Sequence, residues 1–207
     1  MTILALLDYA SVLVFALTGA LVASRAQLDV VGFAFVACLT AVGGGTVRDL
    51  LLNRDMVFWV ADPTHIIIAV LAAVAVFFTA HRVESRMRWL VWLDSFALSI
   101  AAAAGSGVAL ALDQPSIIVV LMGMTTGCMG GLMRDVVCND VPLVLKQGEL
   151  YVSCAMVGAI TAVAAIQFGL PVQPALLTCA ASCWVLRAGS IAFGWHIPVY
   201  KSRPPRQ

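Results

Sequence analysis

The stretch GGGTVRDLLLN at residues 43–53 returns in altered form as MGGLMRDVVCN at residues 129–139. Both stretches contain two glycines, an Arg-Asp pair, three apolar residues and an asparagine at matching positions, and they lie 86 residues apart. Three further pairs obey the same offset without a gap: Asp8 and Asp94, Gly19 and Gly105, Thr40 and Thr126. We therefore predict that the chain consists of two related halves.

The composition points to a protein embedded in a membrane. Of the 207 residues, 62% are hydrophobic and only 11% are charged, whereas soluble domains carry about 25% charged residues. This is too little polar surface to cover a water-soluble globule, so a soluble enzyme and a disordered segment are excluded. The net charge of +1 argues against a basic patch that could bind nucleic acid. Because the composition is so hydrophobic, we expect membrane lipids to surround the protein.

The apolar runs have the length of membrane-spanning helices rather than of barrel strands. Barrel strands alternate polar and apolar residues over roughly ten positions, and a spanning helix needs about 20 apolar residues. The sequence predicts an all-α, polytopic membrane protein with seven transmembrane helices. The runs are Ile3–Ser24, Val30–Leu52, Thr64–Ala80, Trp89–Leu112, Ser116–Cys138, Leu150–Phe168 and Pro174–Trp195.

The offset of 86 divides these seven runs into two groups of three and a single extra helix. Residues 1–207 are expected to form a single transmembrane domain, with repeat one at about 1–84 and repeat two at about 87–170. A seventh helix at about 174–195 and a cytoplasmic tail at 196–207 complete the chain. Because each repeat holds an odd number of helices, the second copy enters the membrane inverted relative to the first.

The basic residues between the runs predict the orientation. Only Arg54 lies on one side of the predicted membrane, and eight lie on the other: Arg25, Arg82, Arg86, Arg88, Lys146, Lys201, Arg203 and Arg206. Cytoplasmic loops carry the excess of Lys and Arg. We expect a bacterial inner membrane, an N-terminus outside and a cytoplasmic C-terminus. The first run, with Asp8 near its start and no preceding basic residue, reads as a retained helix rather than a signal peptide.

Glycines near the middle of the second and fifth runs predict that each helix breaks or bends there. Gly43, Gly44 and Gly45 are contiguous, and Gly130 and Gly131 occupy the matching place in the second repeat. Glycine weakens a helix, and a break at membrane depth would free carbonyl and N–H groups that suit a cation or an anion. The alternative is close helix packing, which the four-residue spacing of Gly123, Gly127 and Gly131 favours.

Three arginines fall inside the apolar runs. A charge at the membrane centre costs at least about 2.5–3.5 kcal/mol, so Arg48 and Arg134 need partners. The aspartate after each arginine points about 100° away on a helix. We therefore expect pairing with an acid of the other repeat, or with Asp8 and Asp94. The alternatives are an aqueous path lined by these residues and a purely structural ion network. Arg187, in the seventh run, is expected to extend to the cytoplasmic side.

No constellation for enzymatic catalysis is present in the sequence. No nucleophile has a base at a suitable spacing, no His-Glu metal motif occurs, and the glycine run lacks the Lys-Ser/Thr of a phosphate loop. The six cysteines lie in or at the ends of apolar runs, where a free thiol packs as a small hydrophobe. We expect no catalytic residue, no metal site and no cofactor.

The motifs GGGTVRD at 43–49, followed by Phe58-Trp59, and GGLMRD at 130–135, followed by VPLVL at 141–145, resemble the prokaryotic trimeric intracellular cation (TRIC) channel family. The resemblance implies a seven-helix protomer, a homotrimer and one pore in each protomer for monovalent cations, chiefly potassium. Helices two and five would be kinked and line that pore. The implied pore residues are Gly43, Gly44, Gly45, Thr46, Arg48, Asp49, Gly130, Gly131, Arg134 and Asp135. Met129 stands where the first copy has Gly43, which makes unequal kinking the expectation.

Two functions follow from these residues. In a potassium channel, freed carbonyls and the hydroxyls of Thr40, Thr46 and Thr126 would replace water around the ion. In a secondary transporter for a small amino acid such as glycine, an arginine and a half-helix N-terminus would hold the carboxylate. Some bacterial relatives in the family have been described as such transporters. A membrane scaffold without transport is disfavoured by the cost of burying Arg48 and Arg134.

Overall fold

The computed structural model describes residues 3–82, 86–146 and 148–198, which form eight α-helices and no strand longer than a single bridge. The prediction of an all-α fold is confirmed. The helices are α1 (Ile3–Arg25), α2 (Val30–Leu51), α3 (Phe58–Ala61), α4 (Thr64–Thr79), α5 (Arg86–Ala111), α6 (Ser116–Val137), α7 (Val152–Gln167) and α8 (Val172–Phe193), with short 3-10 turns η1 (Ala80–Arg82) and η2 (Leu143–Leu145).

Five of the predicted spans are long and apolar enough to cross a membrane. They are α1, α2, α5, α6 and α8 within the described ranges. The other two, α4 and α7, have 16 residues each, which is about 24 Å of helix against a hydrocarbon core of about 30 Å. The turn η1 directly follows α4, and the short helix α3 between α2 and α4 was not predicted from the sequence.

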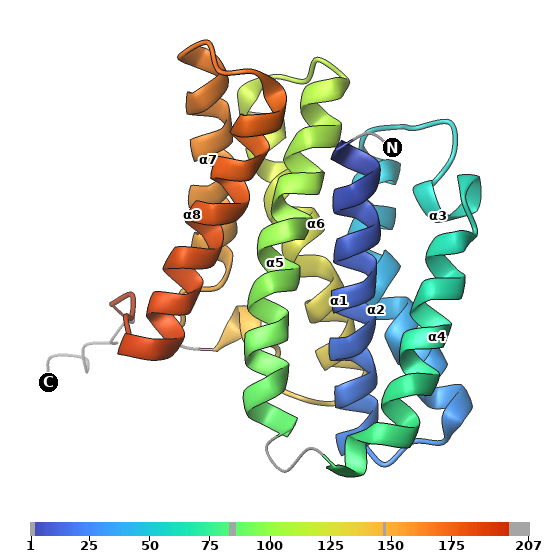
Figure 1. Ribbon diagram of the computed structural model, residues 1–207. Coiled ribbons are helices and arrows are strands. Elements are labelled where there is room, and N and C mark those ends of the chain that lie inside the picture. Colours follow the sequence, from blue (N-terminus) through green and yellow to red (C-terminus); the bar gives the residue numbers. More distant parts are fainter. Residues whose placement is uncertain (1–2, 83–85, 147, 199–207) are drawn as a thin grey trace, which may run out of the picture.

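Helix α5 runs through the centre of the bundle, between α1, α6 and α8 (Figure 1). Its buried face carries consecutive alanines, Ala101 to Ala104, and small side chains let neighbouring helices approach closely. Helix α1 begins at the upper end of the bundle, whereas α5 begins at the lower end and runs in the opposite direction (Figure 1). Helix α4 packs on α1 and α2, and α7 packs on α5 and α6.

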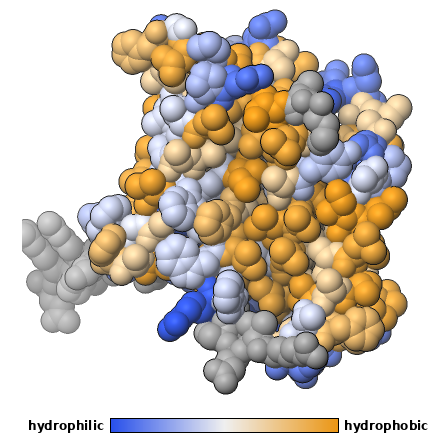
Figure 2. All heavy atoms as spheres, in the orientation of Figure 1, coloured by the Kyte–Doolittle hydropathy of each residue, from blue (hydrophilic) through white to orange (hydrophobic). Residues whose placement is uncertain are grey.

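The outer surface is suited to lipid. Large apolar side chains such as Phe35, Leu71 and Phe78 are exposed on α2 and α4. Figure 2 shows a broad hydrophobic area on this side of the molecule and hydrophilic residues at the upper and lower ends. Soluble monomeric proteins rarely expose contiguous apolar patches of this extent to water. The polarity of the surface therefore agrees with a protein that sits in a membrane.

The predicted breaks at the glycines are wrong. Helix α2 continues through Gly43–Gly45, and α6 continues through Gly130 and Gly131, without leaving the α-helical conformation. The glycines instead allow two helices to touch. A Cβ atom at Gly44 would collide with the Thr126 carbonyl oxygen, and one at Gly130 would collide with the Thr40 carbonyl oxygen. Packing, the alternative interpretation, explains these positions.

The same close approach occurs inside each predicted repeat. A Cβ at Gly19 would lie 2.8 Å from the Val36 carbonyl oxygen, where α1 crosses α2. A Cβ at Gly105 would lie 2.5 Å from the Met122 carbonyl oxygen, where α5 crosses α6. Both pairs are related by the offset of 86, so the two halves use equivalent glycines at equivalent crossings.

Candidate functional site

The first charged cluster lies at the end of α2. Arg48 donates from Nε to Asp49 Oδ1 at 2.8 Å and from Nη1 to Asp8 Oδ1 at 3.2 Å. Asp49 Oδ1 also accepts from Arg54 at 3.1 Å, and its Oδ2 accepts from the backbone N–H of Phe58 at 2.8 Å. The cluster therefore joins α1, α2 and the start of α3, with two positive and two negative groups.

The second cluster repeats this arrangement at the end of α6. Arg134 donates from Nε to Asp135 Oδ1 at 2.8 Å and from Nη1 to Asp94 Oδ1 at 2.8 Å. Asp135 Oδ2 accepts from the backbone N–H of Leu143 at 3.0 Å. In addition, Arg134 Nη1 donates to Thr18 Oγ1 at 3.0 Å. Thr18 belongs to α1, so this hydrogen bond links the two halves.

These contacts correct the predicted pairing. Each arginine pairs with acids of its own half, so the expected ion pair between the repeats is wrong, while Asp8 and Asp94 are confirmed as partners. The neighbouring aspartate is also a partner, contrary to expectation. A flexible arginine side chain places Nε close to its own backbone, where it reaches residue i+1, and extends Nη1 to a more distant helix.

The neighbouring aspartates have a second task that the sequence did not reveal. Asp49 and Asp135 each accept a backbone N–H of the segment that follows the helix, at Phe58 and Leu143. Each carboxylate thereby fixes the position of the next short element, α3 or η2. A signal was present: an apolar segment begins seven residues after Asp49, at Met56, and six residues after Asp135, at Val141.

A small cavity lies beside the crossing of α2 and α6. Its volume is about 10 Å³, which is near the smallest space that holds one water molecule. Asp8 forms part of its wall, with 16% of the side chain exposed, while the Arg48 side chain is fully buried. The other residues of the wall are Ser11, Phe15, Ala41, Gly44, Gly45, Phe58, Ala101 and Thr126. The cavity thus connects the first cluster to the glycine crossing.

Three buried polar atoms at the second cluster have no hydrogen-bond partner among the described residues: Arg134 Nη2, Asp94 Oδ2 and Tyr151 Oη. Two of them lie near Gly131, whose missing Cβ would be 3.1 Å from Tyr151 Oη and 3.6 Å from Arg134 Nη2. Unpaired buried polar atoms are rare and often mark a place for ordered water. Tyr151 was not predicted as a site residue, although the offset of 86 aligns it with His65, which lies against Phe58.

The remaining predicted site residues are engaged in packing. A Cβ at Gly43 would lie 2.8 Å from the Met133 sulfur, and one at Gly45 would lie 2.5 Å from the Phe58 ring. The hydroxyl of Thr46 donates to Val42 and accepts from Trp59 Nε1 at 2.9 Å. Both hydrogen-bonding roles of this hydroxyl are therefore occupied.

Arg187 does not extend to solvent as predicted. Its side chain is 2% exposed and donates from Nη2 to Glu149 Oε2 at 2.9 Å and from Nη1 to the Leu150 carbonyl at 3.3 Å. The guanidinium carbon lies 5.1 Å from the centre of the Tyr151 ring. Arg187 therefore ties α8 to the segment before α7, next to the second cluster.

Comparison with solved structures identifies the fold and the family. A trimeric intracellular cation channel orthologue from Rhodobacter sphaeroides superposes with a TM-score of 0.90 at 40% identity, covering 94% of this chain and all of that one. The chain belongs to the prokaryotic TRIC channel family. A second TRIC cation channel structure gives a TM-score of 0.85 at 27% identity, over 98% of this chain and all of that one.

Sequence comparisons find further relatives of this chain. The family profile described as "Glycine transporter" matches residues 5–81 and again 91–167, and the two matches begin 86 residues apart. The inner membrane protein YadS of Escherichia coli K12 is 31% identical over 92% of each chain. A UPF0126 membrane protein of Vibrio cholerae is 33% identical, over 95% of this chain and 81% of that protein.

Proposed function

We propose that the protein is a channel for monovalent cations, chiefly potassium, with one conduction path inside each protomer. The observation that carries this proposal is the pair of buried Arg-Asp clusters at the C-terminal ends of α2 and α6, with the glycine crossing and its small cavity between them. A charge is costly inside a membrane. Ionisable side chains inside membrane helices are rare and commonly mark substrate or ion paths. The 40% identity to a structure described as a cation channel supports the same function.

The charges favour a cation over an anion. The first cluster balances two arginines against two aspartates, and the second carries one arginine against two aspartates, a formal excess of one negative charge. The carbonyls at the crossing remain in intact helices, so the proposed ion contacts are the carboxylates and the water between them. A cavity of about 10 Å³ holds about one water molecule, so conduction requires α2 and α6 to separate slightly.

The proposed assembly follows the family. Seven helices cross the membrane, with α4 and α7 as the two short crossings, and the halves α1–α4 and α5–α7 form inverted repeats. Three copies associate as a homotrimer in a bacterial inner membrane, with the N-terminus outside and the C-terminus in the cytoplasm. The opposite directions of α1 and α5 (Figure 1) and the matching glycine crossings support the inversion.

A carrier for a small amino acid such as glycine is the second candidate, favoured by the description of the matching family profile. In such a carrier Arg48 or Arg134 would hold the substrate carboxylate. Each of these arginines already binds two carboxylates of the protein, so a substrate would have to displace one of them. In the proposed channel, by contrast, both arginines keep their carboxylate partners.

Recording from the purified protein in planar bilayers under a potassium gradient tests the proposal. We expect unitary current steps that reverse near the potassium equilibrium potential. Saturable flux of labelled glycine without unitary steps would replace the channel with the carrier. Arg48→Gln should change the amplitude or the open probability of the steps, and Arg88→Gln, which removes an exposed charge outside the clusters, serves as the matched control.

A further inference from the structure

A pocket outside the proposed ion path lies at the end of α8. Its volume is about 330 Å³, within the range of small-molecule sites. Its walls come from α5, α8 and the segments that precede α7 and follow α8. We call it the α8 pocket, lined by Val91, Glu149, Arg187, Ser190, Ile191 and His196.

Arg187 gives the α8 pocket an unfilled hydrogen-bond donor. Its two Nη atoms bind Glu149 and the Leu150 carbonyl, but the buried Nε has no partner among the described residues. A buried guanidinium N–H without an acceptor costs free energy comparable to a lost charged hydrogen bond. Nε has almost no accessible surface in this structure, so an oxygen acceptor in the α8 pocket reaches it only when the Arg187 side chain shifts toward the pocket. Carboxylate and phosphate are the anions that arginine binds most strongly.

Glu149 adds a negative charge directly beside the arginine. Glu149 keeps 32% of its side chain exposed while it holds Arg187. Its backbone pairs with His196 in an antiparallel bridge, and the Ile197 N–H donates to the Gly148 carbonyl at 3.0 Å. This pairing holds a carboxylate and an imidazole on one side of the pocket. A ligand with a single negative charge would meet the Glu149 carboxylate unfavourably, whereas an ammonium group next to a phosphate would be bound by it.

The level of the pocket in the membrane decides between a lipid and a soluble ligand. Helix α8 ends at Phe193, whose ring stacks on Trp195 at 5.8 Å, and Trp195 folds back over Gly189. Aromatic residues gather where the hydrocarbon meets the headgroups. Val91 and Ile191 give the pocket an apolar wall next to its charged one. The pocket thus offers a charged face and an apolar face at the depth of a lipid headgroup.

We propose that the α8 pocket binds a phospholipid whose headgroup carries a primary ammonium beside its phosphate, as phosphatidylethanolamine does. The phosphate accepts from Arg187 Nε and from His196, and the ammonium donates to Glu149. The glycerol and the first acyl carbons lie against Val91 and Ile191. Phosphatidylcholine has no N–H for Glu149, and phosphatidylglycerol has no cation, so both bind more weakly.

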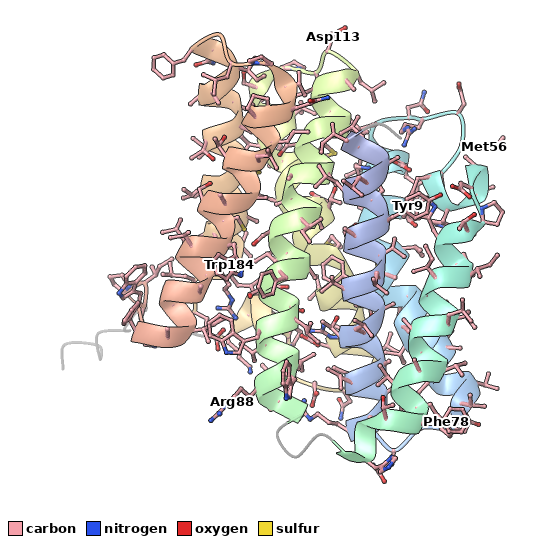
Figure 3. The ribbon with its side chains drawn as sticks, in the orientation of Figure 1. Tyr9, Met56, Phe78, Arg88, Asp113 and Trp184 are labelled. Carbon is pink, nitrogen blue, oxygen red and sulfur yellow. The ribbon has the colours of Figure 1, made fainter. Side chains whose placement is uncertain are left out.

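The test is native mass spectrometry of the purified full-length protein with equal amounts of phosphatidylethanolamine, phosphatidylglycerol and phosphatidylcholine. We expect phosphatidylethanolamine to be retained about tenfold over phosphatidylcholine, the equivalent of one charge-assisted hydrogen bond. Glu149→Gln should bring the ratio close to one, and Arg187→Gln should lower retention of all three lipids. The control Arg88→Gln removes an exposed charge at the same end of the bundle (Figure 3) and should leave the ratio unchanged.

Should Arg187→Gln not fold, Ile191→Trp gives the same test, because it fills the α8 pocket without changing a charge and should abolish the preference. Equal retention of the three lipids by the wild type, or an unchanged preference in Glu149→Gln and Ile191→Trp, would overturn the site. Free phosphoethanolamine is added in a separate arm. If it displaces the lipid at equal concentration, the apolar contacts contribute nothing and the proposal of a lipid is wrong.

Discussion

The two Arg-Asp clusters share one plan and differ in their access to water. In both, Nε binds the next residue, Nη1 binds an aspartate 40 positions upstream, and a carboxylate fixes the following segment. Yet Asp8 and Arg54 keep 16% and 35% of their side chains exposed, whereas no side chain of the second cluster exceeds 5%. The side chains of the first cluster are therefore more accessible to water than those of the second.

The difference follows from a few unmatched residues. Thr18, which binds Arg134, corresponds by the offset of 86 to Ala104, which offers Arg48 no hydroxyl. Arg54, which binds Asp49, corresponds to Asp140, which instead pairs with Arg25 at 3.3 Å. The duplication supplies the scaffold of both clusters. Single substitutions around it decide their charge and their exposure.

The largest effect is expected where the halves are most alike, at the glycine crossing. Gly44→Leu and Gly130→Leu should each destabilise the protein by about 3 kcal/mol or more, because no side chain fits against the opposing carbonyl. The thermal transition of the protein in detergent measures this. Gly127→Ala is the control, because a Cβ there would lie 3.1 Å from the end of the Leu98 side chain and 3.2 Å from the Leu98 carbonyl oxygen, which leaves more room than the opposing carbonyl oxygens leave at the crossing. Normal stability of either leucine variant would contradict the crossing.

Removal of the arginine should destabilise the protein more in the second cluster than in the first. Arg134→Gln leaves two buried carboxylates without a cation and should cost about 3–5 kcal/mol. Arg48→Gln should cost less, since Asp8 can turn to water and Asp49 retains Arg54. Chemical unfolding of the two variants gives the comparison. An equal loss of stability in the two variants would mean that the exposure of a cluster does not affect the cost of removing its arginine.

A smaller change tests the link between the halves. Thr18→Val removes an acceptor from buried Arg134 and should cost about 1–2 kcal/mol. Ala104→Ser places a hydroxyl at the matching position near Arg48. It should raise the thermal transition slightly if the pseudo-symmetry extends to this contact. The prediction would be contradicted if Ala104→Ser lowered the thermal transition while Thr18→Val left it unchanged.

The smallest effect is expected at the exposed pair of Arg25 and Asp140. Asp140→Asn should change the stability by less than about 1 kcal/mol, and the change should shrink as salt is added, because both side chains are at least 32% exposed. Thermal unfolding at low and high sodium chloride measures it. A loss that is large and independent of salt would show that this pair is more deeply coupled to the second cluster than its exposure indicates.

The sequence was most informative where the physical cause acts along the chain. Apolar run length predicted the helices, and the offset of 86 predicted that Gly19 and Gly105 would have equivalent roles. It was least informative about which side chains contact one another in the folded chain. The neighbouring aspartate of each arginine was set aside on helix geometry alone, and Tyr151 and Thr18 were missed because their contacts come from helices remote in sequence.

The sequence by itself determined that the chain lies in a membrane, that it is helical and that its halves are related, because hydrophobic length and repeated motifs are local properties. Only the tertiary structure decided what the glycines do. A glycine both weakens a helix and permits a close crossing, and the choice depends on whether another backbone arrives at its surface. The carbonyl oxygens of Thr126 and Thr40 lie against Gly44 and Gly130. The two helices therefore remain continuous, and the two halves pack closely at this crossing.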